Sequence, residues 1–177
     1  WKAHGWVDMR QAIAVSSDVY FYEIGGGYEG QKGLGISLID KYMSMFGFGK
    51  NIGDGFFNGA SGVIPDPEWK AKNFDGESWN IGNTYHTSIG QYGFQVSPIQ
   101  VVRAVASVAN NGKLLEPSIL LGGNKDKFVQ LNLNSDYFRI VREGMKLGVE
   151  QGSASGLNMG YLTLGAKTGT AELGSKK

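Results

Sequence analysis

The segment Lys167-Thr168-Gly169-Thr170 combines a cation, two hydroxyl groups and a position without a side chain. On an extended strand, Lys167 and Gly169 share one face and the two threonines share the other. The ammonium and the hydroxyls can hold a carboxylate, and the glycine lets another backbone approach closely. The pattern predicts a sheet edge that binds an extended peptide by strand addition, although so short a string also arises by chance.

A second polar cluster, Ser16-Ser17-Asp18, interrupts a helical pattern near the start of the chain. Hydroxyl and carboxylate groups at such a break can project into a cleft and transfer protons. The alternative is an N-cap for the following helix, where Ser and Asp are the usual residues. Alone, the cluster favours the cap, but S-x-D followed by K-T-G is part of the signature of penicillin-binding proteins.

Other short motifs are weaker. Gly25, Gly27 and Gly30 fit G-x-G-x-x-G, but a dinucleotide fingerprint must follow a strand, and these glycines follow a helical pattern, so we interpret them as a helix stop. His4 and His86 have no carboxylate or second histidine at ligand spacing and are expected to be structural or solvated. The absence of cysteine excludes disulfides, thiolate metal sites and a cysteine nucleophile.

Hydrophobic periodicity predicts the elements that must position these groups. We expect a helix over 7–24, capped by Asp8 and broken at 16–18, and further helices over 37–46, 98–109 and 135–149. Residues 47–96 should form a long, loop-rich excursion that its aromatic side chains anchor. A flexible turn is expected over 152–156 and a strand over 161–172. Ser97-Pro98 is a strong helix start. The helix after it should bury one apolar face, made of Ile99, Val102, Val105, Ala106 and Ala109.

Composition restricts the function classes. The 177 residues suffice for one folded domain, with 41% hydrophobic and 19% charged residues. Lys plus Arg total 17 and Asp plus Glu total 16, giving a net charge of +1. Nucleic-acid binding relies on clustered basic residues, so no nucleic-acid partner is expected. No apolar run approaches the length of a membrane span.

Ordered blocks along nearly the whole chain resemble the transpeptidase domain of class B penicillin-binding proteins, nearest to the penicillin-binding protein 2 group. The blocks are Gly5–Ile13, Ser16–Tyr22, Phe46–Gly49, Gly62–Pro65, Trp69-Lys70, Ser88–Gln91, Ser97–Gln100, Ala109–Gly112, Gly152–Ala154 and Ala166–Ala171. The resemblance implies an α+β fold of the penicillin-binding-protein/β-lactamase type. A helical part would carry S-x-D, an antiparallel sheet would carry K-T-G, and the site would lie between them.

The departures from that family also carry information. Its nucleophile lies in an S-x-x-K motif, and no serine of this chain has Lys three residues later. The expectation is therefore a partial transpeptidase domain over residues 1–177, truncated at both ends. It would lack the upstream S-x-x-K segment and the C-terminal strands, and it would be inactive alone. Asp18 stands where many relatives have Asn, and Gly152-Ser153-Ala154 replaces a commoner Gly-Thr-Ala.

The activity that the resemblance implies is cross-linking of peptidoglycan stem peptides by a serine D,D-transpeptidase, which also binds penicillin. It would need no cofactor and no metal. The implied catalytic residues are Ser16 as proton relay, Asp18 as hydrogen-bond acceptor and Lys167 as source of positive potential. The implied substrate-binding residues are Thr168, Gly169 and Thr170.

Alternatives stay open at this point. A D,D-carboxypeptidase or a β-lactam sensor shares these motifs, and a non-catalytic scaffold of the cell-wall elongation machinery is a different class. The implied partners are stem peptides, β-lactams and elongation proteins including a glycosyltransferase. The implied location is the outer side of a bacterial cell membrane, reached through an N-terminal anchor that this sequence does not contain.

Overall fold

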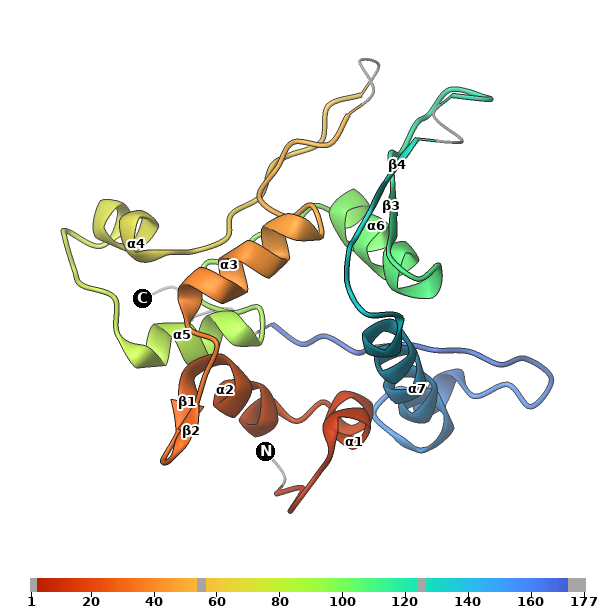
Figure 1. Cartoon of the computed structure of the whole chain (residues 1–177), viewed down its shortest axis with the longest axis horizontal. Helices are drawn as coiled ribbons and strands as arrows, with labels where there is room; N and C mark the ends of the chain where they lie inside the picture. The colour runs from red at the N-terminus through yellow and green to blue at the C-terminus, as the bar shows by residue number, and fades with distance from the viewer. Residues whose placement is uncertain (1–2, 54–56, 124–126, 172–177) are drawn as a thin grey trace. The chain divides into compact units, whose positions relative to one another are not determined.

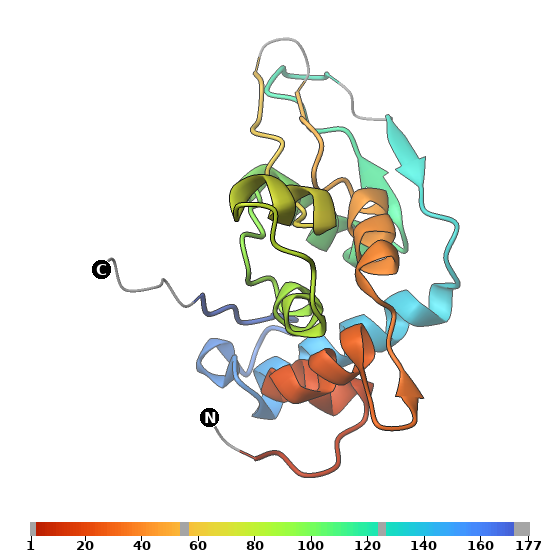
Figure 2. The same ribbon diagram turned by 90° about the vertical axis from the view of Figure 1, so that its left-hand side faces the viewer.

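The structure is a computed structural model that describes residues 3–53, 57–123 and 127–171. Helices and short antiparallel strands make the fold α+β (Figures 1 and 2). In chain order the elements are α1 (Met9–Val15), α2 (Asp18–Gly26), β1 (Gly27–Tyr28), β2 (Gln31–Lys32), α3 (Ile36–Met45), α4 (Pro67–Asn73), α5 (Ile81–Ser88), α6 (Pro98–Ala109), β3 (Lys113–Leu115), β4 (Phe128–Gln130), α7 (Ser135–Gln151) and the 3₁₀ helix η1 (Ser155–Leu157). Among the described residues, none of the helices is both long and apolar enough to cross a bilayer.

The chain divides into two compact units. The first joins the residues up to Tyr20 with those from Leu133 onward, and the second is Phe21–Asn132. Both motifs singled out in the sequence, S-x-D and K-T-G, lie in the first unit.

Close contact between α1 and α7 organises the first unit, and Figures 1 and 2 show the two helices side by side. On α7, Gly144 and Gly148 face α1 at successive turns, and Gly152 follows at the C-cap. A Cβ at Gly144 would lie 2.9 Å from Cβ of Ile13, and one at Gly152 would collide with the carbonyl oxygen of Ala14. Small residues on α7 therefore set how near α1 can come.

Both ends of α1 form as predicted. The Asp8 carboxylate accepts a hydrogen bond from the Gln11 N–H at 2.9 Å, and the Gln11 side chain accepts one from the Asp8 N–H at 3.2 Å. At the C-cap, Ser16 takes φ 56° and ψ 55°, a left-handed conformation that non-glycine residues rarely adopt. This turn breaks the helix at the predicted residues and redirects the chain into α2.

Side-chain ion pairs also link α1 to α7. Arg10 Nε lies 2.6 Å from a carboxylate oxygen of Glu143, whose other oxygen lies 2.8 Å from Arg139. Hydrogen bonds from Arg10 and then Arg139 lower the pKa of Glu143 below its ordinary value. All three side chains are solvent-accessible, so these pairs add little stability compared with the helix packing.

The prediction of a strand over 161–172 is wrong for the described residues. Met159 and Leu162 form an isolated antiparallel bridge, and residues 163–171 have no regular secondary structure. The Ala166 N–H donates instead to the Met145 carbonyl of α7 at 3.1 Å. Strand ladders in the described part of the chain are confined to the hairpins β1–β2 and β3–β4, so a helix holds this segment, and Glu172 lies outside the described residues.

In the second unit, α6 begins at Ser97-Pro98 and ends at Asn110, as predicted. The expected apolar face is wrong. Val102 is 62% exposed and Val105 is 48% exposed, whereas Gln100 is fully buried.

The buried Gln100 amide organises the loops around it. Its Nε2 donates to the carbonyls of Lys50 at 2.9 Å and Ser61 at 2.8 Å, and its Oε1 accepts from the Ser97 N–H at 2.8 Å. Buried polar atoms must be paired to be tolerated, and this side chain pairs both its donor and its acceptor. A polar group thus occupies the interior position that the periodicity assigned to aliphatic residues.

The excursion over 47–96 contains two helices, α4 and α5, that the sequence reading missed. Both are short and polar, so they lack an apolar period, but each has a capping residue. Asp66 accepts from the Trp69 N–H at 2.7 Å, and Asn80 accepts from the Asn83 N–H at 3.1 Å. The expected aromatic anchoring is confirmed by a cluster in which Tyr92 contacts the rings of Trp69, Phe74 and Trp79.

We expect Gly152→Ala to destabilise the protein by about 1–3 kcal/mol, because the new methyl group must displace the backbone of α1 at Ala14. Gly156→Ala is the matched control, since a Cβ there meets nothing within 4 Å. Denaturant unfolding of both variants measures the difference. Equal stabilities would show that the α1–α7 contact has room for a side chain.

We also expect Gln100→Leu to cost about 1–3 kcal/mol in free energy of unfolding, because it removes the buried amide that donates to the part-buried carbonyls of Lys50 and Ser61. Val102→Ala, on the exposed side of the same helix, should change stability by less than about 0.5 kcal/mol. The same denaturant titration compares the two. A larger loss of stability for Val102→Ala than for Gln100→Leu would show that α6 packs through its aliphatic face.

Candidate active site

Lys167 and Ser16 meet in the first unit although they are 151 residues apart in sequence. The ammonium Nζ of Lys167 donates to Ser16 Oγ at 2.7 Å and to the carbonyl oxygen of Thr168 at 2.7 Å. Two of its three N–H groups are thereby used, and none of the described residues takes up the third. The contact brings S-x-D and K-T-G to one point.

Helix α7 positions both partners of this contact. Ser16 ends α1, which packs on the glycine face of α7. On the other side, the hydrogen bond from Ala166 to Met145 fixes the residue before Lys167. A Cβ at Gly148 would lie 3.3 Å from the Ala166 carbonyl oxygen, so a glycine of α7 also lets this segment lie close.

The charge state of Lys167 is set by two opposing effects. Partial burial of its ammonium lowers its pKa below the ordinary value, and the negative charge of Asp18 raises it. Burial is the larger effect, so Lys167 loses its proton at a lower pH than a solvated lysine does. Asp18 is half-buried at the first position of α2 and acts here as the opposing charge.

The cap interpretation of the polar cluster applies to Ser17. Its hydroxyl oxygen accepts from the Tyr20 N–H at 3.4 Å, and the residue is buried. Asp18 already lies inside α2, so it is not the N-cap. The two serines therefore differ in role, because Ser17 caps α2 and Ser16 binds Lys167.

The remaining predicted residues differ in their surroundings. Thr168 is half-buried, and its hydroxyl lies 2.7 Å from that of Ser153. Gly169 and Thr170 are exposed, and a Cβ at Gly169 would meet nothing within 4 Å. Sequence reasoning missed Ser153 as a member of this group, because the block Gly152-Ser153-Ala154 carries no spacing that links it to Lys167.

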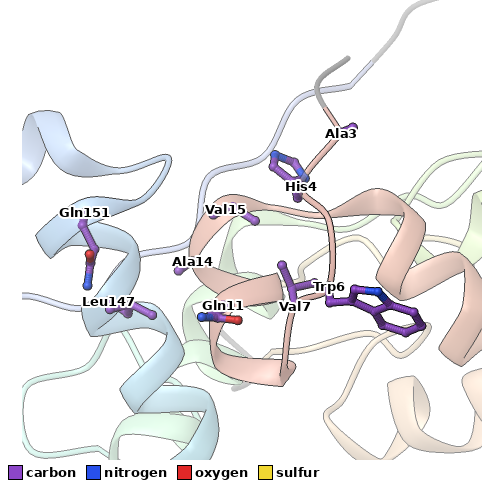
Figure 3. Close-up of a pocket in the computed structure, with 9 residues that line it drawn as sticks. All are labelled: Ala3, His4, Trp6, Val7, Gln11, Ala14, Val15, Leu147 and Gln151. Atoms are coloured by element: carbon purple, nitrogen blue, oxygen red, sulfur yellow. The ribbon is translucent and has the colours of Figure 1, made fainter.

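A separate hollow of about 390 Å³ opens on the first unit between the N-terminal segment, α1 and the end of α7 (Figure 3). Its lining includes His4, Gln11 and Leu147, and the Trp6 ring beside it is fully exposed. His86, the other histidine, is exposed beside the Tyr22 ring. Among the described residues, no group of three or more histidine, aspartate or glutamate side chains is arranged to hold a metal ion.

Comparison with known proteins gives consistent matches. The family model for the penicillin-binding protein transpeptidase domain matches residues 1–177. The peptidoglycan D,D-transpeptidase MrdA of Acinetobacter baumannii is 32% identical over 99% of this chain and 27% of its own length. MrdA of Salmonella typhimurium is 30% identical over 100% of this chain and 30% of its own length.

Solved structures agree with the sequence matches. Penicillin-binding protein PBP2 from Helicobacter pylori is similar with a TM-score of 0.81 and 32% identity, covering 98% of this chain and 33% of that one. The complex between PBP2 and MreC from the same organism gives a TM-score of 0.79, covering 96% of this chain and 31% of that one. The chain thus spans about a third or less of the length of each of these four proteins.

The ordered sequence blocks, the joined S-x-D and K-T-G motifs and the full-length family match agree with one another. The chain therefore belongs to the penicillin-binding protein transpeptidase domain family, and within it is similar to the PBP2 and MrdA proteins.

Proposed function

We propose that the protein carrying this chain is a peptidoglycan D,D-transpeptidase that forms a serine acyl-enzyme and reacts with penicillin. The observation that carries the proposal is the 2.7 Å hydrogen bond from Lys167 to Ser16, because it joins the two motifs. Similarity to MrdA proteins, which are named peptidoglycan D,D-transpeptidases, supports the reaction class.

The proposed reaction is acyl transfer in two steps. A serine hydroxyl attacks the carbonyl of a D-Ala-D-Ala stem peptide, and the terminal D-Ala leaves as an amine. The amine of a neighbouring stem peptide then attacks the acyl-enzyme, which forms the cross-link and frees the serine. This sequence has no S-x-x-K, and it spans 27% and 30% of two MrdA relatives, so we propose that the intact protein supplies the nucleophile and its lysine from outside these residues.

Ser16 is suited to relay a proton to the leaving amine. Its oxygen accepts from Lys167, so its own hydrogen is free to point elsewhere. When Ser16 gives that hydrogen to the departing nitrogen, the adjacent ammonium can return one to Ser16. The negative charge of Asp18 favours the protonated form of Lys167, because it opposes the lowering of the Lys167 pKa by burial.

The carboxylate end of the substrate fits the K-T-G segment. Lys167 offers a third N–H, and the hydroxyls of Thr168 and Thr170 add uncharged donors. Gly169 faces open space, which leaves room for a peptide backbone. The Thr170 backbone N–H would be one donor to the oxyanion, and the nucleophile's own N–H would be the other.

We further propose that the intact protein is anchored in the bacterial cell membrane and works on its outer side with cell-wall elongation proteins, a glycosyltransferase among them. The support for a protein partner is the complex between PBP2 and MreC from Helicobacter pylori. A carboxypeptidase or a β-lactam sensor would share the acylation step and would differ in the acceptor. Product analysis with a stem-peptide amine separates these from a transpeptidase.

In the intact protein, Lys167→Ala should slow acylation by penicillin about 10- to 150-fold, which corresponds to losing a charge-assisted hydrogen bond of roughly 1.5–3 kcal/mol in the transition state. Lys146→Ala on the exposed side of α7 is the control and should acylate at the wild-type rate. The rate is followed with a fluorescent penicillin, and thermal melts report folding. Unchanged acylation of the Lys167 variant would remove this residue from the site.

Asp18→Asn should retain most acylation at neutral pH. As pH rises, however, its acylation rate should begin to fall at a lower pH than that of the wild type. The ammonium of Lys167 must be charged to hold a carboxylate, so acylation falls as pH rises through the Lys167 pKa. Removing the Asp18 charge removes the effect that raises this pKa and so moves the fall to lower pH. Asp18→Ala also removes the acceptor and should slow acylation at least about tenfold with little change in melting temperature. An alkaline limb that does not move would contradict the pairing of Asp18 with Lys167.

A further inference from the structure

We propose that Ser153 is a positioning residue for recognition of the substrate's anionic end. Its hydroxyl donates to Thr168 Oγ1 and so leaves the Thr168 proton free for a carboxylate. The inference rests on the proposed role of the K-T-G segment and adds to it a residue just beyond the C-terminus of α7.

The contact is close and one partner is firmly held. Ser153 Oγ and Thr168 Oγ1 are 2.7 Å apart. The Ser153 N–H donates to the Ala14 carbonyl of α1 at 2.9 Å, and the next residue, Ala154, is buried with its N–H bonded to the Gly148 carbonyl at 3.0 Å. The Ser153 side chain therefore projects from a backbone fixed to both helices.

The direction of the hydrogen bond decides what Thr168 can do. Each hydroxyl has one proton, and the distance allows either residue to be the donor. The neighbouring ammonium of Lys167 donates to the Thr168 carbonyl, so it does not compete for the hydroxyl oxygen. With Ser153 as donor, an arriving carboxylate completes a chain from Ser153 through Thr168 to the anion, in which each hydrogen bond polarises the next.

The competing explanation is purely mechanical, because the hydroxyl pair also ties the K-T-G segment to the end of α7. A mechanical tie would affect every substrate equally. A donor relay would affect ligands that present a carboxylate and spare those that do not. The hydroxyl pair is accessible to solvent, so a substitution of the Ser153 side chain should leave the fold intact.

The test compares acylation of the intact protein by benzylpenicillin and by its methyl ester. Ser153→Ala should slow acylation by the acid about 3- to 10-fold, the loss expected for a neutral hydrogen bond, and change the ester rate less than about twofold. Ser153→Thr keeps the hydroxyl and should restore the acid rate to within about twofold of the wild type. Ser155→Ala, an exposed serine two residues on, is the matched control and should leave both rates unchanged.

Each outcome gives a decision. A loss confined to the acid and rescued by threonine supports the relay. Equal losses for acid and ester, or no loss with the acid, overturn it while leaving the proposed transpeptidase in place. A wild-type protein that neither compound acylates overturns the proposed function, and the relay with it.

Discussion

The close approach of α1 to the glycine face of α7 is the constraint on which the site depends. Gly144 and Gly152 leave no space for side chains between the two helices, so α1 comes near enough for its C-cap residue, Ser16, to reach Lys167. The same helix fixes Ala166 through the Met145 carbonyl. Because both motifs are held against the same helix, α7, their mutual geometry does not depend on the loops that join them.

Electrostatics then determines how the assembled groups behave. The Lys167 ammonium is partly buried, which disfavours its charge, and Asp18 restores some of that charge preference. Two hydrogen bonds orient the ammonium toward Ser16 and its own segment. A cation held in this way is already oriented before any anion arrives, so less orientational entropy is lost on binding.

The second unit shows that buried polar side chains can organise the loops around them. Gln100 bonds the carbonyls of two loops, and Lys70, also buried, donates to the Ser78 carbonyl at 2.7 Å and the Asn83 amide oxygen at 3.1 Å. Loop backbones have unpaired polar groups that aliphatic side chains cannot satisfy. Long polar side chains can, which explains why hydrophobic periodicity misassigned the interior of α6 and missed α4 and α5.

From the sequence alone it was possible to predict the family, the caps at Asp8 and Ser97 and the break at Ser16, because these depend on local spacing and on ordered motifs. The meeting of Ser16 with Lys167 and the contact of Ser153 with Thr168 could be found only in the tertiary structure. Both depend on backbone separation between α1 and α7, which glycines set across residues far apart in the chain. The failed strand has a similar cause, since a ladder requires a partner strand, and within the described residues Ala166, just before the K-T-G segment, pairs with a helix carbonyl instead.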